Sequence, residues 1–187
     1  VQLFEDGYKC WINIDNLEIE EYPINIQEIS IPDKALIQQR IPKILEWINK
    51  QTLKTNQYLW GGTLGPNYDC SGLIQTAFLK HGIYLPRDSY EMKSFCRHVI
   101  SFPGNIEILE IGDLLFFGDN NKCNHVGIYC GDGNYYHSSG KDYGRNRIGI
   151  DNLIEYKRDV ISNYYYSKLI SAGRVIENYR WDTTLVY

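Results

Sequence analysis

Cys70 is the side chain in this sequence that is best placed to act as a nucleophile. It follows a glycine-rich turn at 61–65 and directly precedes a helical pattern at 71–81, so we expect its sulfur at a helix N-terminus. The unpaired N–H groups and the dipole of a helix N-terminus favour a thiolate, the reactive form of cysteine. A free cysteine is also commonly a small buried residue that fills space, so position alone leaves that alternative open.

His125 and His137 are the candidates for the base and for the group that orients it. They lie in strand-like runs on either side of a turn at 131–133, which predicts an antiparallel hairpin with both rings at the same end. A Cys-His pair needs a third group to hold the imidazole in its working tautomer, and a second imidazole can do this. Two alternatives are unrelated histidines at strand ends and a metal site completed by Cys123 and Cys130.

The surrounding pattern predicts helices first and strands afterwards. The first helix is expected to start at Asp33 as its N-cap, with Pro42 kinking it or delaying its start. The helical pattern at 71–81 is expected to end at Gly82. From residue 112 onward the runs are strand-like, and 170–176 adds a late strand. This order is typical of an α+β domain.

The composition is that of one globular domain with at most a small second module. Of the 187 residues, 43% are hydrophobic and 22% are charged, which suffices for one sizeable core. The net charge of -4, without a Lys/Arg cluster, argues against binding to nucleic acid or to an anionic membrane. No apolar run reaches the roughly 20 residues of a membrane-spanning helix. We therefore expect small molecules or peptides as partners.

The cysteines indicate the redox environment. The five cysteines form an odd set without a CxxC pair, which favours neither a disulfide framework nor a zinc ribbon and fits a reducing compartment. No secretion signal opens the chain, yet it begins at Val1 and not at Met, so we expect the native start to lie upstream.

Six sequence blocks resemble, in order and spacing, the signature of the NlpC/P60 family of cysteine peptidases. They are Tyr58-Leu59-Trp60-Gly61-Gly62, Asp69-Cys70-Ser71-Gly72-Leu73, Leu85-Pro86-Arg87-Asp88-Ser89-Tyr90, Gly112-Asp113-Leu114-Leu115-Phe116-Phe117, His125-Val126-Gly127-Ile128-Tyr129 and His137. One block alone is a weak signal, but all of them in register are highly specific. The resemblance implies a papain-like α+β domain over 33–187, in which helices pack on an antiparallel sheet.

The resemblance also implies which residues act. Cys70, His125 and His137 match the family's catalytic Cys-His-His set, which needs no metal or other cofactor. Tyr58 matches a tyrosine that helps the backbone N–H of Cys70 to hold the oxyanion.

Four further positions are implicated in substrate binding. Asp69, Ser71 and Ser89 match residues that line the cleft in members specific for γ-D-glutamyl bonds. We add Arg87, because a D-Glu residue in the substrate keeps a free α-carboxylate that an arginine would balance. The alternative role for Arg87 is a structural ion pair.

Residues 1–22 resemble the closing strands of a bacterial SH3-like (SH3b) module, and 23–32 are expected to form a linker. The run alternates apolar and polar residues around a turn at Asp6-Gly7, and Cys10 stands where a glycine is usual. In family members of this arrangement the module closes one end of the cleft and selects a free N-terminal L-Ala. The resemblance thus implies that Tyr8 reaches the ammonium group of the substrate and that Asp69 waits unpaired as its counter-charge. The alternative is a wall anchor far from the active site.

The expected reaction is hydrolysis of the bond between γ-D-glutamate and a diamino acid in peptidoglycan peptides. The substrate would be L-Ala-γ-D-Glu-diamino acid, with meso-diaminopimelate or Lys, and the work would suit cell-wall recycling in the cytoplasm. The alternatives are a papain-like amidase or acyltransferase, an extracellular hydrolase of intact peptidoglycan, and a non-catalytic wall-binding protein.

Overall fold

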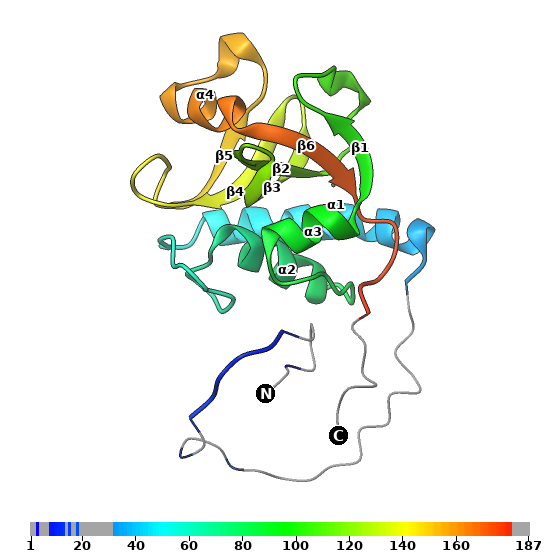
Figure 1. The fold of residues 1–187 in the computed structure, drawn as a ribbon, viewed down its shortest axis with the longest axis vertical. Coiled ribbons are helices and arrows are strands. Elements are labelled where there is room, and N and C mark those ends of the chain that lie inside the picture. The colour runs from blue at the N-terminus through cyan, green and yellow to red at the C-terminus, as the bar shows by residue number, and fades with distance from the viewer. Residues whose placement is uncertain (1–2, 4–7, 14, 16–17, 19–31, 181–187) are drawn as a thin grey trace.

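The computed structural model describes residues 3, 8–13, 15, 18 and 32–180. Residues 32–180 fold into an antiparallel sheet with helices on both faces, as Figure 1 shows. The helices are α1 (Lys34–Thr52), α2 (Cys70–Leu79), α3 (Ser89–Phe95) and α4 (Val160–Ser167), with short 3-10 helices η3 (Ile106–Ile108) and η4 (Glu155–Lys157). The strands are β1 (Arg97–Ser101), β2 (Leu114–Asp119), β3 (Lys122–Gly131), β4 (Asn134–Ser139), β5 (Arg147–Asn152) and β6 (Leu169–Arg174). The α+β class predicted from the sequence is confirmed.

The strands lie in the order β1-β6-β2-β3-β4-β5, and each neighbouring pair is antiparallel. The predicted turn at 131–133 joins β3 to β4, with Gly131 opposite Asn134. His125 lies opposite Phe117 of β2, directly beside an irregularity in the ladder between Phe117 and Gly118. Such irregularities bend a strand and redirect its side chains, so this one lies where a functional side chain is expected.

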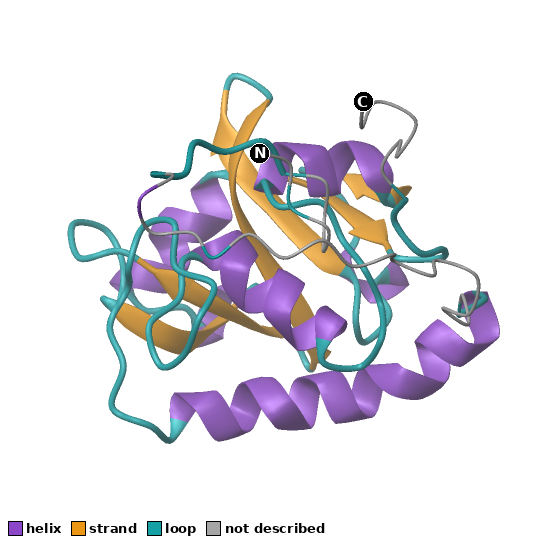
Figure 2. Cartoon of the chain, turned by 90° about the horizontal axis from the view of Figure 1, so that it is seen from below, coloured by secondary structure: helices purple, strands orange, loops and turns teal. Residues whose placement is uncertain are grey.

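Each face of the sheet has its own hydrophobic core, because side chains alternate along a strand. In β2, Leu114 and Phe116 join the core that includes residues of α1, α2 and α3, whereas Leu115 and Phe117 join the core that includes Tyr165 of α4. Figure 1 shows α1, α2 and α3 on one side of the sheet and α4 on the other, and Figure 2 shows the long helix α1 along one border of the molecule. Strand β3 therefore has α2 on one side and α4 on the other.

Helix α1 begins where the sequence predicts, because Asp33 accepts a hydrogen bond from the N–H of Leu36 (2.9 Å). Pro42 lies inside the helix and does not delay its start, so the expected delay is wrong and the expected kink stays a prediction. Four isoleucines of one helix face are almost completely buried: Ile37, Ile41, Ile44 and Ile48. Their burial outweighs the proline penalty of about 3 kcal/mol, since each buried aliphatic side chain contributes about 1.5–3 kcal/mol.

The sequence prediction lacks α3, β1, β5 and α4, and it extends α2 too far. Helix α2 ends at Leu79 and not at His81, although Gly82 does adopt the left-handed conformation of a helix-ending glycine (φ 70°). Helix α4 has its own cap, because Asp159 accepts a hydrogen bond from the N–H of Ser162 (2.8 Å). Strand β5 and helix α4 both supply residues to the candidate site.

The expected SH3b remnant over 1–22 and the linker over 23–32 lie largely outside the described residues. Among the described ones, the N–H of Leu3 donates to the carbonyl of Tyr8 (2.9 Å). No helix in the described part of the chain is long and apolar enough to cross a membrane.

Candidate active site

Cys70 is the first residue of helix α2 and is held there by close backbone packing. The carboxylate of the N-cap residue Asp69 accepts hydrogen bonds from the N–H of Gly72 (2.6 Å) and the N–H of Gly61 (2.8 Å), which ties the glycine-rich turn to the helix. A side chain at Gly72 would meet the carbonyl oxygen of Gly62 at 2.1 Å, so only glycine permits this approach.

The Cys70 thiol is buried, with 5% of the residue exposed. Burial raises the pKa of this thiol to about 12, and the Asp69 carboxylate adds to the effect. The N–H groups of Val126 and Ser71 lower the pKa through hydrogen bonds, but they do not outweigh burial. Burial therefore opposes the thiolate that the helix N-terminus favours, and a resting thiolate stays a prediction.

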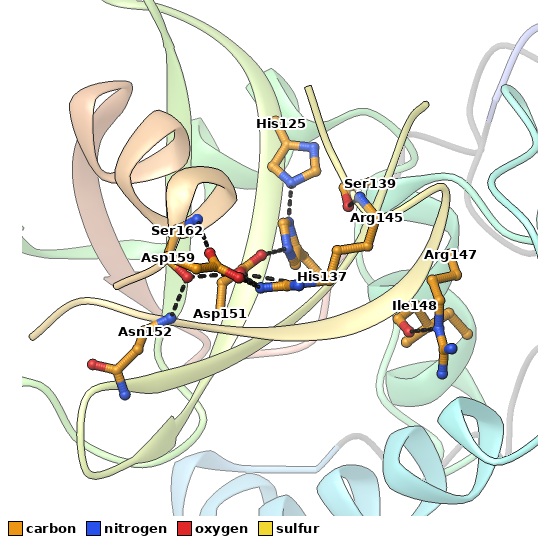
Figure 3. A network of polar contacts seen from close by, with 10 residues as sticks. All are labelled: His125, His137, Ser139, Arg145, Arg147, Ile148, Asp151, Asn152, Asp159 and Ser162. Carbon is orange, nitrogen blue, oxygen red and sulfur yellow. Dashed lines mark hydrogen bonds and ion pairs between the residues drawn. The ribbon is translucent and has the colours of Figure 1, made fainter. Parts of the chain in front are cut away.

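A buried hydrogen-bonded chain crosses strands β3, β4 and β5, as Figure 3 shows. His125 Nε2 lies 2.7 Å from His137 Nδ1, and His137 Nε2 lies 2.5 Å from Asp151 Oδ2. The side chains of His137 and Asp151 are completely shielded from solvent. The structure thus brings together the two histidines that the sequence places on one hairpin, and it adds an aspartate to them.

The order of donors and acceptors along this chain fixes the tautomer of each ring. Burial alone would raise the pKa of Asp151, but hydrogen bonds from His137 and Arg145 outweigh it and hold the pKa below its ordinary value. Because Asp151 is an ionised acceptor, His137 donates from Nε2 and accepts at Nδ1, so His125 must donate from Nε2. Burial and the neighbouring His137 lower the pKa of His125 well below its ordinary value. His125 is therefore neutral, and its Nδ1 carries a lone pair that can accept a proton.

Asp151 is itself held by two residues that the sequence prediction missed. Arg145 forms an ion pair with Asp151 Oδ1, and Ser162 Oγ donates to the same oxygen (2.7 Å). Arg145 also pairs with Asp159 (2.8 Å), the N-cap of α4. No sequence motif marks Asp151, Arg145 or Ser162. Their role follows from contacts in the folded chain between β5, α4 and the loop before β5.

Two tyrosines flank the site. The Tyr165 ring centroid lies 4.7 Å from that of His125 and 4.6 Å from that of His137, so this ring packs against both imidazoles. Burial raises the pKa of Tyr58, and the charges of Cys70 and Asp69 raise it further. Tyr58 therefore presents a neutral hydroxyl near Cys70, as a donor to an oxyanion would. Tyr165 is absent from the sequence prediction.

Three of the predicted substrate-binding residues form one cluster. Arg87 Nη2 lies 2.7 Å from Asp69 Oδ2, and Arg87 Nη1 donates to Ser71 Oγ at 2.8 Å. The expectation that Asp69 waits unpaired is therefore wrong, because its carboxylate already balances Arg87 and caps α2. The structural ion pair that the sequence left open for Arg87 is present, and direct contact of the cluster with substrate stays a prediction.

Ser89 and Tyr8, the other predicted substrate-binding residues, are placed near the start of α3. Ser89 is the buried first residue of α3, and it hydrogen-bonds the thiol of Cys123, which is close enough to Cys70 to affect its pKa. Tyr8 is exposed. The adjacent glutamate is the main cause of the raised pKa of Tyr90, and Tyr8 contributes to it, so Tyr8 lies near this helix start. Contact of Ser89 or Tyr8 with substrate stays a prediction.

The contacts in the structure differ from those of the metal site that the sequence left open for the two histidines with Cys123 and Cys130. Within the described ranges, no group of three or more His, Cys, Asp and Glu side chains is arranged to hold a metal ion. Cys123, which that alternative required, donates to the backbone carbonyl of His125 (3.5 Å).

Comparison with known sequences gives consistent matches. A family model described as the NlpC/P60 family matches residues 55–174. The chain is 34% identical over 136 residues to the bifunctional muramidase/DL-endopeptidase CwlT of Bacillus subtilis, covering 70% of this chain and 36% of that protein. It is 43% identical over 84 residues to a gamma-D-glutamyl-L-lysine dipeptidyl-peptidase of Bacillus cereus, covering 43% of this chain and 24% of that protein. The chain thus spans well under half the length of these relatives.

Solved structures show the same fold. An NlpC/P60 family protein from Bacillus cereus matches with a TM-score of 0.54 at 27% identity, covering 80% of this chain and 42% of that chain. A lipoprotein-like NLP/P60 family protein from Staphylococcus aureus matches with a TM-score of 0.54 at 29% identity, covering 82% of this chain and 46% of that chain.

Proposed function

The chain belongs to the NlpC/P60 family, and we propose that it is a cysteine peptidase in which Cys70 attacks, His125 is the base and His137 orients it. The observation that supports this most strongly is the buried chain from Asp151 through His137 to His125. It leaves a neutral imidazole whose Nδ1 is ready to accept the proton of a thiol. Helix α2 supplies that thiol beside Val126, the next residue of the same strand.

The proposed mechanism starts from a neutral thiol and a neutral imidazole. Nδ1 of His125 takes the proton of Cys70 as the sulfur attacks the substrate carbonyl carbon. The Tyr58 hydroxyl and the Cys70 N–H donate to the resulting oxyanion. His125 then gives the proton to the leaving nitrogen, the C–N bond breaks, and an acyl-enzyme remains. Water, deprotonated by His125, attacks the thioester, and the proton returns to the Cys70 sulfur as the acid leaves.

The proposed substrate bond joins γ-D-glutamate to a diamino acid in peptidoglycan peptides. The names of the two relatives, a DL-endopeptidase and a gamma-D-glutamyl-L-lysine dipeptidyl-peptidase, support this class of bond. Arg87 and Ser71 beside Cys70, together with Ser89 at the start of α3, offer donors for the free α-carboxylate of D-Glu. Arg87 can bind this carboxylate and still stay paired with Asp69, because a guanidinium has five N–H donors.

We also propose that the preferred peptides carry a free N-terminal L-Ala, which would suit cell-wall recycling in the cytoplasm. The support is the position of Tyr8 near the start of α3, the helix that begins at Ser89. A hydroxyl there is suited to accept a hydrogen bond from an ammonium group.

Peptide hydrolysis followed by mass spectrometry tests this function. The free tripeptide L-Ala-γ-D-Glu-diaminopimelate should yield L-Ala-γ-D-Glu and the diamino acid, whereas its N-acylated form and intact peptidoglycan should be cut much more slowly. Cys70→Ala should yield no product, and EDTA should leave the wild-type rate unchanged. Comparable rates on intact wall would favour the extracellular wall hydrolase, a function that the muramidase/DL-endopeptidase relative makes a specific rival. Cleavage at another amide bond would favour the amidase.

A further inference from the structure

A cavity of about 240 Å³ opens beside His125 on the α4 side of the sheet. Its inner wall includes His125, Tyr58 and Tyr165. Burial is the main cause of the raised pKa of both tyrosines, and the ionised form of Cys70 adds to it, so both tyrosines lie near the nucleophile. None of the four predicted glutamyl-binding residues lines this cavity.

The position of the base decides which half of a substrate this cavity can hold. An amide substrate places its carbonyl carbon at the Cys70 sulfur, and its two halves extend to opposite sides. His125 must hand a proton to the leaving nitrogen, so the leaving half lies over His125. The glutamyl half then lies toward Arg87 and Ser71, which pair with each other at the start of α2. The cavity is therefore on the side of the leaving amino acid.

The outer part of the cavity carries charges of both signs. Lys168 follows α4 and pairs with Asp119 at the end of β2 (2.5 Å), while Lys141 and Asp142 line the cavity from the loop after β4. The Lys168 ammonium also lies 5.8 Å from the ring centroid of Tyr164. The Lys168 side chain is 31% exposed and that of Asp119 is 60% exposed, so both charges remain accessible to a ligand.

We propose that this cavity binds a leaving diamino acid whose far end carries both an ammonium and a carboxylate, as meso-diaminopimelate does. Lys168 binds the carboxylate, and Asp119 binds the ammonium. The proposal rests on the peptidase function proposed above and names the substrate that function leaves open. A leaving lysine presents an ammonium for Asp119 but no carboxylate at its far end for Lys168, so it matches only one member of the pair. A leaving diaminopimelate matches both members of the Lys168–Asp119 pair.

Three matched tripeptides test the proposal: L-Ala-γ-D-Glu followed by meso-diaminopimelate, by diaminopimelate with an amidated far carboxylate, or by lysine. The wild-type kcat/KM should be about tenfold higher for the first than for the other two, because one charge-assisted hydrogen bond is at stake. Lys168→Met should remove that preference by slowing the first peptide alone. Lys157→Met is the matched control, since Lys157 lies outside the cavity, and it should keep the preference.

Binding measurements keep the inference separate from the catalytic proposal. In a Cys70→Ala background, calorimetric titration should show the diaminopimelate tripeptide bound about tenfold more tightly than the amidated one, and Lys168→Met should abolish the difference. If the wild type cuts none of the peptides but this binding preference is present, the peptidase proposal fails and the cavity assignment stands. Equal affinities, a preference for lysine, or an equal loss on all three peptides in Lys168→Met would overturn the assignment.

Discussion

The two halves of the candidate site hold their reacting groups in different ways. On the helix side, Cys70 is fixed by neighbours in sequence, through the Asp69 cap and the approach of the glycine-rich turn to Gly72. On the sheet side, His125 is fixed through a chain of partners on other strands, ending at Asp151. The helix side thus sets a position by backbone packing, whereas the sheet side sets a protonation state by hydrogen bonds.

This difference implies that the two sides fail differently when they are altered. Burial raises the pKa of the Cys70 thiol, so we expect that the helix side alone does not activate the nucleophile. Activation depends on a base in the correct tautomer, which the sheet side supplies. Substitutions on the sheet side should therefore lower the rate while the nucleophile stays in place, and substitutions around Asp69 should mainly lower stability.

The largest expected effect comes from removing the nucleophile. Cys70→Ala should lower kcat/KM for the tripeptide by about 10⁴-fold or more, because no other group can form the acyl-enzyme. The melting temperature should change by only a few degrees, since one small residue replaces another. Cys130→Ser is the matched control on β3 and should keep its activity. Turnover by Cys70→Ala close to that of wild type would remove Cys70 from the mechanism.

The next largest effect should follow from breaking the sheet side at Asp151. Asp151→Asn should lower kcat by about 100-fold, because an amide can donate to His137 and so favour the wrong tautomer of both histidines. Asp159→Asn is the control: it removes the outer partner of Arg145 but keeps a side chain that can cap α4. Steady-state kinetics should show Asp159→Asn within about twofold of wild type. Equal losses in both variants would mean that Asp151 acts only through its negative charge and not through its hydrogen bond to His137.

A smaller effect, on stability, should follow from breaking the helix side at Asp69. Asp69→Asn leaves Arg87, whose side chain is 11% exposed, without its counter-charge. The free energy of unfolding should fall by about 3 kcal/mol, as measured by urea denaturation. Lys50→Met breaks the exposed pair with Glu46, which solvent screens, and should cost much less. An Asp69→Asn variant as stable as Lys50→Met would show that the buried pair does not support the helix start.

The smallest expected effect is a pH dependence of stability from His125. Its folded-state pKa lies well below the ordinary value, so the unfolded chain binds a proton below about pH 6.5 while the folded protein does not. This contribution is fully present above that pH and is lost as the pH falls toward the folded pKa, by at most about 1.4 kcal/mol per pH unit. Denaturation of wild type and His125→Gln between pH 7 and pH 5 should show a steeper fall for wild type. Parallel curves would contradict a neutral buried His125.

Local sequence signals predicted the parts of the fold that depend on neighbouring residues. Asp33 caps α1 as predicted, and the turn at 131–133 joins β3 to β4. The delay expected from Pro42 was wrong, because a buried helix face outweighs the loss of one hydrogen bond. Local rules give the cost of a proline, but they do not give the burial that offsets it.

The same contrast holds for the candidate site. Cys70, His125 and His137 stand inside recognisable blocks, so the sequence identified them as candidates. Asp151 appears in the sequence as one acid in an alternating run, and its contact with His137 depends on how β5 pairs with β4. The burial that raises the pKa of the Cys70 thiol also escaped prediction, because the helix N-terminus is a local feature whereas burial arises from the whole fold.

Strand β5 lies at an edge of the sheet, so the catalytic residues depend on a strand that can open before the rest of the fold does. Among the described strands, β5 pairs with β4 alone, and it carries Asp151 at the end of the hydrogen-bonded chain. Edge strands open at a lower free energy than central ones, and their amides exchange hydrogen sooner. Each opening of β5 would break the hydrogen bond between Asp151 and His137, so that His125 is no longer held in one tautomer, while Cys70 and its helix stay folded. On heating, catalysis should therefore be lost before the protein melts, in step with hydrogen exchange along β5.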